Sequence, residues 1–266
     1  MPKKKPEKKK QNVVKKPANA IVHIMGESPM VEEYAELCAS RGYAVVVQWN
    51  EAPTPLPKFQ ASTIKRSSAI SRDTSVGIEL TNTNAEQKRK NLQQLDKALA
   101  STSAIVSTSL TITATEQSTW IQQRHRLVGM SALPSLIQKP LVEVAPTVFS
   151  PKETLEVVNR FFHSIGKETA IVQDRVGMVL PRILCQIINE ASFAIQEDVA
   201  SAQDIDTAMR LGVNYPHGPV EWADTIELKQ VYAVLAALEN DLKEDRYRVS
   251  PLLRQMAQSG VWWKQE

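Results

Sequence analysis

The stretch from residue 21 to residue 35 contains the residue types from which a phosphate-binding turn could be built. An apolar run, I-V-H-I-M, stops at Gly26, a short turn follows, and a helix-like stretch begins near Met30. A strand, a glycine-containing turn and a helix N-terminus in this order are typical of dinucleotide-binding sites, where backbone N–H groups face the diphosphate. Such a turn normally has three glycines, and this stretch has one. The chemistry left in the turn therefore decides whether the chain is an enzyme.

Other reactive side chains form no pattern that predicts chemistry from spacing alone. Cys38 and Cys185 lie far apart in apolar surroundings, which predicts buried thiols in a reducing cytoplasm rather than a disulfide or a nucleophile. The histidines do not have the spacing of metal ligands, and we expect no metal site. They are His23, His125, His163 and His217.

The first half of the chain alternates strand-like and helix-like stretches. Residues 20–24 and 44–48 are short apolar runs, and residues 30–40 between them place apolar side chains on one helical face, which predicts a βαβ unit. The Pro- and Ser-rich residues 51–74 are expected to be irregular. Further strands are expected over residues 76–80, 104–107 and 141–145, and a further helix over residues 84–99. These elements favour an open, mostly parallel sheet.

The second half has the pattern of helices alone. From Met178 onward, apolar residues recur at helical spacing without a strand pattern between them. Ser201–Asp204 resembles a capping box, with Asp in place of the usual Glu, and predicts a helix that ends at Gly212. A turn follows, and another helical region is expected from Asp224. We therefore expect an all-helical domain over residues 174–266.

Charge is distributed unevenly along the 266 residues. Residues 1–16 hold eight lysines against one acid, which leaves 24 basic and 28 acidic residues for the rest of the chain. Residues 1–19 are therefore predicted to be a disordered, solubilising arm, the alternative being electrostatic attraction to nucleic acid or an anionic membrane. We do not expect nucleic acid to be a partner. No apolar run has the length of a membrane span, and a cytoplasmic protein is expected.

Ordered motifs in the second half resemble the helical domain of the L-3-hydroxyacyl-CoA dehydrogenase family. The family patterns are D-x-P-G-F-x-x-N-R, N-E-A, I-D-x-A-M-x-x-G, and Y-P-x-G-P followed by D. They correspond here to Asp174–Arg182, Asn189–Ala191, Ile205–Gly212, Tyr215–Pro219 and Asp224.

This resemblance implies an α/β plus all-α fold. A shortened Rossmann-like parallel sheet would form an NAD-binding domain over residues 20–173, followed by a helical dimerisation domain over residues 174–266. It further implies NAD as cofactor and oxidation of the 3-hydroxyl group of acyl-CoA thioesters, as in the 3-hydroxybutyryl-CoA dehydrogenases.

The family's cofactor-binding turn has changed at most of its positions. Its G-x-G-x-x-G falls on Gly26, Ser28 and Val31. Side chains at the second and third glycine positions obstruct the diphosphate and the close packing of helix on strand. The acid that would hold the ribose hydroxyls falls on Trp49 or Asn50. The resemblance therefore predicts poor NAD binding in the usual pose.

Two further family positions are kept. Glu79 and Lys88 match the family's I-E-A and the lysine nine residues later, whereas the second glutamate of that motif is Thr83. We interpret the pair either as remnants of a cofactor site or as solvated charges on a helix. Together with Gly26 and Ser28, they are the candidate cofactor-binding residues.

The family's catalytic groups are mostly substituted. A glutamate that orients a histidine base corresponds to Glu143, and the histidine twelve residues earlier corresponds to Ser131. The serine that holds the substrate oxygen corresponds to Thr108. The asparagine of N-T-S-S-L falls on Val106, and the asparagine of G-F-x-x-N-R falls on Pro181. Because a serine hydroxyl is no base near neutral pH without its own activator, only Glu143 keeps the family's residue type.

Two hypotheses follow from this pattern. The first is a catalytically degraded homologue with a binding or assembly role in fatty-acid and acyl-CoA metabolism. It would act as a homodimer, or as a heterodimer with an active relative through the helical domain, with acyl-CoA as a candidate ligand. The second is an active NAD-dependent L-3-hydroxyacyl-CoA dehydrogenase with an atypical site. Loss of both cofactor and substrate groups beside a well-formed helical pattern favours the first.

Overall fold

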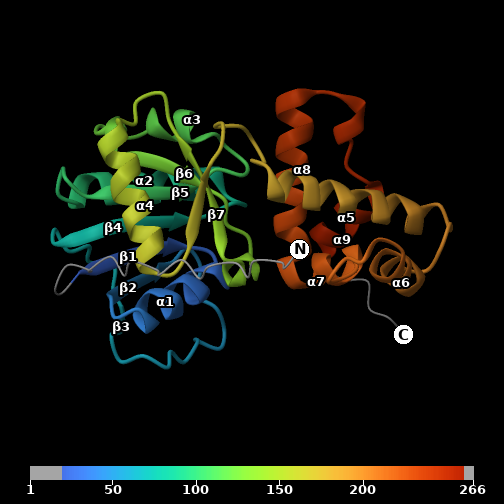
Figure 1. The fold of residues 1–266 in the computed structure, drawn as a ribbon, viewed down its shortest axis with the longest axis horizontal. Coiled ribbons are helices and arrows are strands. Elements are labelled where there is room, and N and C mark those ends of the chain that lie inside the picture. Colours follow the sequence, from blue (N-terminus) through green and yellow to red (C-terminus); the bar gives the residue numbers. More distant parts are fainter. Residues whose placement is uncertain (1–19, 261–266) are drawn as a thin grey trace, which may run out of the picture.

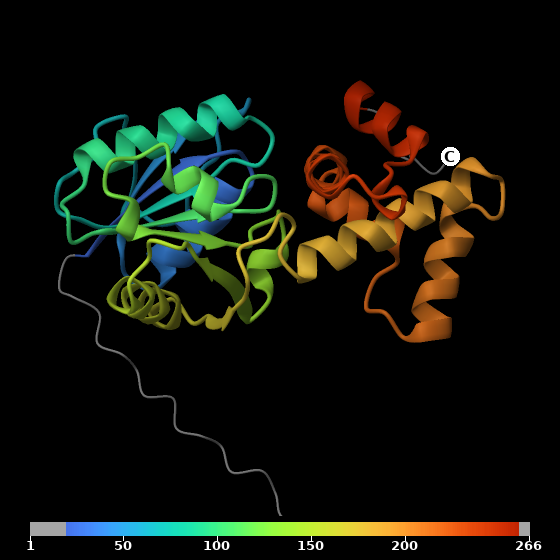
Figure 2. The same ribbon diagram turned by 90° about the horizontal axis from the view of Figure 1, so that it is seen from above.

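A computed structural model describes residues 20–260 of the chain. They form a sheet region followed by a helical region, which lie side by side in Figures 1 and 2. The expected fold class is therefore confirmed. The expected arm over residues 1–19 lies outside the described residues. The predicted division between residues 173 and 174 falls in the connection between the last strand and the first long helix of the helical region.

The sheet region is built on eight strands in the order β3-β2-β1-β4-β5-β6-β7-β8. Neighbouring strands are parallel except for the antiparallel pair β6 and β7. Because the chain runs outward from β1 to β3 and then returns to β4 on the other side, the strand order reverses between β1 and β4. The strands are β1 Ile21–Gly26, β2 Ala44–Trp49, β3 Ile64–Arg66, β4 Thr74–Leu80, β5 Ala104–Thr108, β6 Leu127–Met130, β7 Leu141–Pro146 and β8 Glu168–Ile171.

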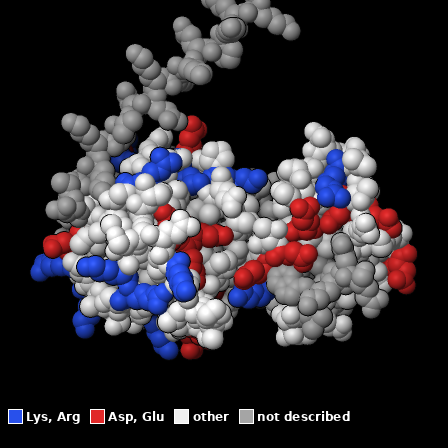
Figure 3. Space-filling view, turned by 90° about the horizontal axis from the view of Figure 1, so that it is seen from below, with Lys and Arg blue, Asp and Glu red and all other residues white. Residues whose placement is uncertain are grey.

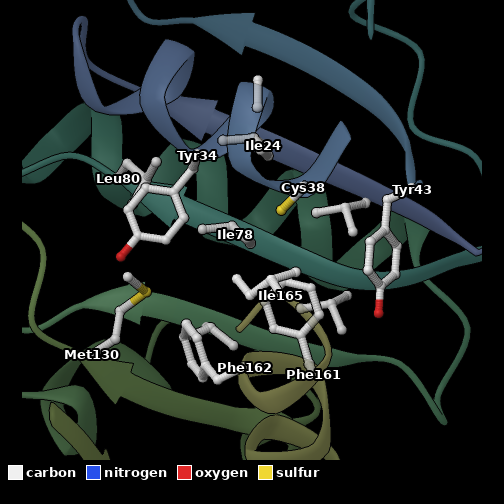
Figure 4. Close-up of a cluster of buried hydrophobic side chains, with 14 of the residues drawn as sticks. Ile24, Tyr34, Cys38, Tyr43, Ile78, Leu80, Met130, Phe161, Phe162 and Ile165 are labelled. Carbon is white, nitrogen blue, oxygen red and sulfur yellow. The ribbon is translucent and has the colours of Figure 1, made fainter. Parts of the chain in front are cut away.

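Helices cover both faces of this sheet. On one face, α1 (Met30–Ser40) and α4 (Lys152–Ser164) pack on alternate side chains of the central strands, including Ile24 and Ile78. Figure 4 shows this core, in which Tyr34 and Cys38 of α1 lie opposite Phe161 and Phe162. On the other face, α2 (Ala85–Ala98) and α3 (Ala114–Ser118) cover Met25 and Ile105. Successive side chains of one strand therefore point to opposite faces of the sheet and pack in two different cores.

The helical region has its own core, centred on α5 and α8. Apolar side chains of α5 such as Leu184 and Ile188 pack against Val231, Leu235 and Leu238 of α8. Leucine and alanine side chains of the sheet region extend the same cluster, so the two regions share buried surface. The helices are α5 Leu180–Gln196, α6 Ala202–Val213, α7 Pro219–Ile226, α8 Leu228–Leu242 and α9 Pro251–Ser259.

The elements expected from the sequence are present, with shifted ends and several additions. The Ser201 side chain caps α6 as predicted, accepting a hydrogen bond from the Asp204 N–H at 3.1 Å. The helical region expected from Asp224 consists of two helices: α7 begins at Pro219, whose fixed φ suits the first turn of a helix, and α8 follows from Leu228. Helix α4 and strands β6 and β8 were not predicted, and β3 lies inside the segment expected to be irregular. No helix among the described residues is long and apolar enough to cross a membrane.

Candidate functional site

The candidate site is a crevice at the carboxyl ends of β1 and β4, where the strand order reverses. Open α/β sheets bind ligands at this position. A hollow of about 400 Å³ lies there, between the turn after β1, the end of β2, the end of β4 and the start of α8. Its lining residues are Glu27, Ser28, Asn50, Glu51, Ala52, Pro53, Thr83, Asn84, Glu227 and Lys229.

Gly26 is required where the turn leaves β1. Its φ is +148°, and a Cβ placed on it would lie 2.6 Å from the backbone carbonyl of Leu80 on β4. The next residue donates its backbone N–H to that same Leu80 carbonyl at 3.1 Å. Because only a glycine allows β1 and β4 to approach so closely, the one glycine kept from the motif has a structural reason to remain.

The other two glycine positions carry side chains that make contacts within the protein. The Ser28 hydroxyl donates to Glu32 Oε1 at 2.8 Å, and Val31 is fully buried in the core under α1. The first turn of α1 also contains Glu32 and Glu33, two acids at the helix end that normally attracts an anion. Burial raises the pKa of Glu33, although its contact with the Ser135 N–H opposes this shift.

Glu27 places a carboxylate in the crevice, and the sequence interpretation missed it. Its Oε1 accepts from the Thr83 backbone N–H at 3.0 Å and from the Thr83 hydroxyl at 2.6 Å. Its Oε2 accepts from the Asn82 N–H at 3.2 Å and from Gln230 Nε2 of α8 at 2.8 Å. The only sequence signal was an acid directly after the first glycine of a phosphate-binding motif. The crevice thus already contains a carboxylate with four hydrogen bonds.

The residues at the ribose position are also engaged within the protein. Trp49 donates its indole N–H to Glu32 at 3.1 Å and stacks on Phe59, with ring centroids 6.0 Å apart. Asn50 donates to Thr81 Oγ1 at 2.8 Å and accepts from Asn91 Nδ2 at 2.8 Å. Neither residue presents an acidic group to a ribose.

Glu79 and Lys88 form a buried ion pair beneath the crevice. Both side chains are at most 1% exposed, so their interpretation as solvated charges is wrong. The Lys88 ammonium also donates to the Ser107 hydroxyl at 3.0 Å and to the Thr108 hydroxyl and carbonyl, both at 2.9 Å. Burial lowers the pKa of Lys88, and Glu79 opposes that shift. The network satisfies the ammonium, which makes it a structural element of the crevice floor.

The structure brings Ser131, Glu143 and the start of α5 together, but not as an acid–base pair. The Ser131 hydroxyl accepts from the backbone N–H of Glu143 at 3.2 Å. The Glu143 carboxylate instead accepts from the N–H groups of Val179 and Leu180, at 2.9 and 2.7 Å. Both oxygens therefore bind orphan donors at the N-terminus of α5. Pro181, at the asparagine position, is buried in the first turn of α5.

Thr108 belongs to the buried ion-pair network and not to this group. Its hydroxyl accepts from Lys88 and donates to the Thr81 carbonyl at 3.0 Å. Within residues 20–260, no hydrogen bond joins Thr108 to Ser131 or Glu143. Val106 at the neighbouring asparagine position lies in the core.

His23, His125 and the two cysteines do not supply the missing base or a nucleophile. The ring nitrogens of His23 are buried without a hydrogen-bond partner, and burial lowers the pKa of His23 to about 4. His125 is exposed in a short turn before β6. Burial raises the pKa of Cys38 and of Cys185 to about 12, which makes both poor nucleophiles. No group of three potential metal ligands occurs among the described residues.

Comparison with known families finds two matches that follow one another along the chain. Residues 57–175 match the model "3-hydroxyacyl-CoA dehydrogenase, NAD binding domain", and residues 177–265 match "3-hydroxyacyl-CoA dehydrogenase, C-terminal domain". The first match begins after β2, so the turn at Gly26 and the end of β2 lie outside it.

Among curated relatives, a probable 3-hydroxybutyryl-CoA dehydrogenase of Deinococcus radiodurans is 32% identical over 71% of this chain and 68% of its own. A 3-hydroxybutyryl-CoA dehydrogenase of Bradyrhizobium diazoefficiens is 29% identical over 71% of this chain and 64% of its own, just under two thirds of its length.

Solved structures extend the similarity to nearly the whole chain. The (S)-3-hydroxybutyryl-CoA dehydrogenase of Ralstonia eutropha matches with a TM-score of 0.76 and 27% identity, over 92% of this chain and 95% of that chain. The fold is therefore similar even where the turn at Gly26 differs.

Proposed function

The chain belongs to the 3-hydroxyacyl-CoA dehydrogenase family, and from that premise we propose that it has no NAD-dependent turnover of its own. It serves instead as a binding or assembly partner in acyl-CoA metabolism, with a second copy of itself as its partner. The observation that carries the proposal is the Glu27 carboxylate at the position of the family's diphosphate-binding turn.

Charge is the main obstacle to NAD in this crevice. A diphosphate against the turn would meet Glu27, while Glu51 and Glu227 also line the hollow and Lys229 is the basic residue among the lining groups. Two like unit charges about 4 Å apart repel by roughly 1 kcal/mol in water and about 4 kcal/mol at an effective dielectric constant of 20. Glu27 would also have to give up four hydrogen bonds. The residues present do not fit an NAD diphosphate in the family's pose.

The catalytic positions support the same proposal. Proton removal needs a base within hydrogen-bond reach, and its loss costs roughly 10²- to 10⁴-fold in rate. Ser131 has no activating base, since the Glu143 carboxylate is occupied by the N–H groups of α5. The chain thus keeps the orienting acid of the family while using it to anchor a helix.

Exposed apolar side chains on the helical region, which we call its apolar face, support the assembly role. Asp206 is the buried residue of α6, while Leu211 and Val213 are 82% and 56% exposed, and Ile183 of α5 is 55% exposed. The helical region has acidic and basic side chains on the face shown in Figure 3, and a hollow in its surface is lined by acids of α5 together with Arg246 and Arg248. A patch with both signs of charge can pair with itself about a two-fold axis, so we assign this face to a second copy of the chain.

A turnover assay tests the proposed lack of catalysis. Purified protein is given NADH and acetoacetyl-CoA, the product expected from 3-hydroxybutyryl-CoA oxidation, with the Ralstonia eutropha enzyme as positive control. We expect no NADH consumption above the protein-free rate. Sustained consumption would overturn the proposal and favour an active dehydrogenase, the second candidate, which the names of the relatives support.

Sedimentation velocity tests the assembly role separately. The expected result is a dimer at micromolar concentration, weakened by a charged substitution in the apolar face, Leu211→Lys. Gln94→Lys, on the exposed side of α2, serves as the control with the same change of charge. A monomer at high concentration would remove the self-assembly role, and a dimer insensitive to Leu211→Lys would place the interface elsewhere.

A further inference from the structure

The contacts of Glu27 cross from the sheet region to the helical region. Its Oε2 accepts from Gln230 Nε2 of α8 at 2.8 Å, and the side chains are 203 positions apart in sequence. Gln230 is fully buried. Because buried amide side chains are nearly always hydrogen-bonded, its partners are expected to matter for the fold. This arrangement makes Gln230 the helical region's point of attachment to the crevice.

A second residue of the sheet region closes the same network. Asn82, at the end of β4, donates from Nδ2 to Gln230 Oε1 at 3.0 Å and to the Ala132 carbonyl at 3.0 Å. The backbone N–H of Asn82 donates to Glu27. Both ends of the Gln230 amide are therefore bound, one to the turn after β1 and one to β4.

We infer that Glu27, Asn82 and Gln230 form a latch that holds the sheet and helical regions together across the crevice. The segments after β1 and β4 both bind this one side chain of α8, and Asn82 extends the network to the Ala132 carbonyl after β6. The Glu27 carboxylate lies where the strand order of the sheet reverses, and the hydrogen bond that it accepts from Gln230 joins the two regions. Hydrogen bonds to an ionised group are stronger than neutral ones, which suits Glu27 to this task.

Two other contacts limit how the latch can open. Glu33 of α1 accepts from the Ser135 N–H at 3.0 Å, which ties α1 to the segment after β6. Glu143 accepts from the start of α5, on the β7 side of the sheet. Because neither contact involves Gln230, breaking the latch leaves both of them in place, together with the apolar cluster that α8 shares with Leu110, Leu133 and Ala145 of the sheet region. Opening should then be a change in the spacing of the regions and not unfolding.

Paired spin labels measure this spacing directly. Glu86→Cys in α2 and Gln203→Cys in α6 place labels at exposed positions in the two regions, and the native cysteines Cys38 and Cys185 are buried. In the protein without ligand, we expect one narrow distance distribution. Removing the carboxylate by Glu27→Ala should broaden it and shift it to longer distances.

Variants on both sides of the contact keep the test decisive. Gln230→Leu keeps the side chain's size and removes its amide, so it should broaden the distribution in the same way. Glu27→Gln removes the charge and turns one of the two accepting oxygens into an NH2 donor. It should have a smaller effect than Glu27→Ala and provides a reading where Glu27→Ala does not fold. Glu51→Ala removes an acid from the same hollow that makes no hydrogen bond to Gln230, and it should match the parent protein.

The latch is overturned by a broad distribution in the parent protein. It is equally overturned by an unchanged distribution in folded Gln230→Leu or Glu27→Gln, or by equal broadening in Glu51→Ala. These outcomes are independent of the proposed function, since the distances are measured without nucleotide. Turnover by the parent protein would refute the proposed function and leave the latch standing.

Discussion

The crevice and the helical region use carboxylates in the same way but with different consequences. In the helical region, Asp206 accepts from the N–H groups of Val220 and Glu221 at 2.8 and 3.0 Å, which starts α7. In the crevice, Glu27 accepts from the N–H groups of Asn82 and Thr83. The first carboxylate stabilises a helix, and the second occupies a place where a dinucleotide fold would receive a ligand's anion.

This comparison identifies two family positions that the fold itself requires. Gly26 stays because β1 and β4 approach closely, and Glu143 stays because α5 needs acceptors for its first N–H groups. At the positions that the family resemblance assigns to the base and the amide, this chain has Ser131 and Pro181. A retained family residue is therefore not by itself a sign of retained chemistry.

The largest loss of stability is expected from breaking the buried ion pair of Lys88 and Glu79. Lys88→Met would leave the buried Glu79 without its cation, which should lower the free energy of unfolding by about 3–5 kcal/mol. Urea unfolding followed by circular dichroism measures it. Lys90→Met, an exposed lysine on the same helix, should change stability by less than about 0.5 kcal/mol. Equal losses of stability in the two variants would show that the buried ion pair does not stabilise the fold.

The second effect is a pH dependence of stability that comes from His23 in the core of the sheet region. Burial lowers the pKa of His23 from its ordinary value of 6.5 to about 4, so the folded protein keeps this ring neutral while the unfolded chain protonates it. Stability should therefore fall as pH drops from 6.5 to 4, by at most about 3 kcal/mol from this group. His23→Leu should flatten that part of the pH profile measured by urea unfolding. His125→Gln is the exposed control, and an unflattened profile in His23→Leu would contradict the assignment.

A third effect measures the helix-starting carboxylate of the helical region. Asp206→Ala removes both acceptors from the first turn of α7 and should cost about 2 kcal/mol of stability. Asp204→Ala changes an exposed acid on the same helix and should cost less, because only the Ser201 hydroxyl donates to it. Thermal unfolding of both variants gives the comparison. A larger loss in Asp204→Ala would mean that α7 does not depend on Asp206.

The smallest effect is expected at the family's base position. Ser131→Ala removes one acceptor of the Glu143 N–H and should change stability by no more than about 1 kcal/mol. Acetoacetyl-CoA reduction should stay at background in both proteins. A measurable rate that Ser131→Ala abolishes would restore a catalytic role to Ser131.

Local patterns predicted much of the fold from the sequence. The alternation of β1 and β2, the helical spacing of α1 and the capping serine of α6 all depend on neighbouring residues, and each element was expected. Helix α4 was missed although Leu155, Val158 and Phe162 have helical spacing, and β6 and β8 are too short to show a clear alternation.

The site could be predicted only at positions that the resemblance supplied. Glu27 and Gln230 are 203 positions apart, and nothing local to either residue indicates their contact. The burial of Lys88 likewise depends on Ser107 and Thr108 of another strand, which explains why the lysine was open to interpretation as a solvated charge. Interactions across strands and regions are what the sequence patterns did not contain.

Titration with NADH tests the central claim most directly, and Trp49 beside the crevice provides the fluorescence signal. We predict no saturable change in protein fluorescence up to about 1 mM NADH, which corresponds to a binding free energy weaker than about 4 kcal/mol. The Ralstonia eutropha enzyme, titrated alongside, should saturate. Saturable micromolar binding to this protein would contradict the account.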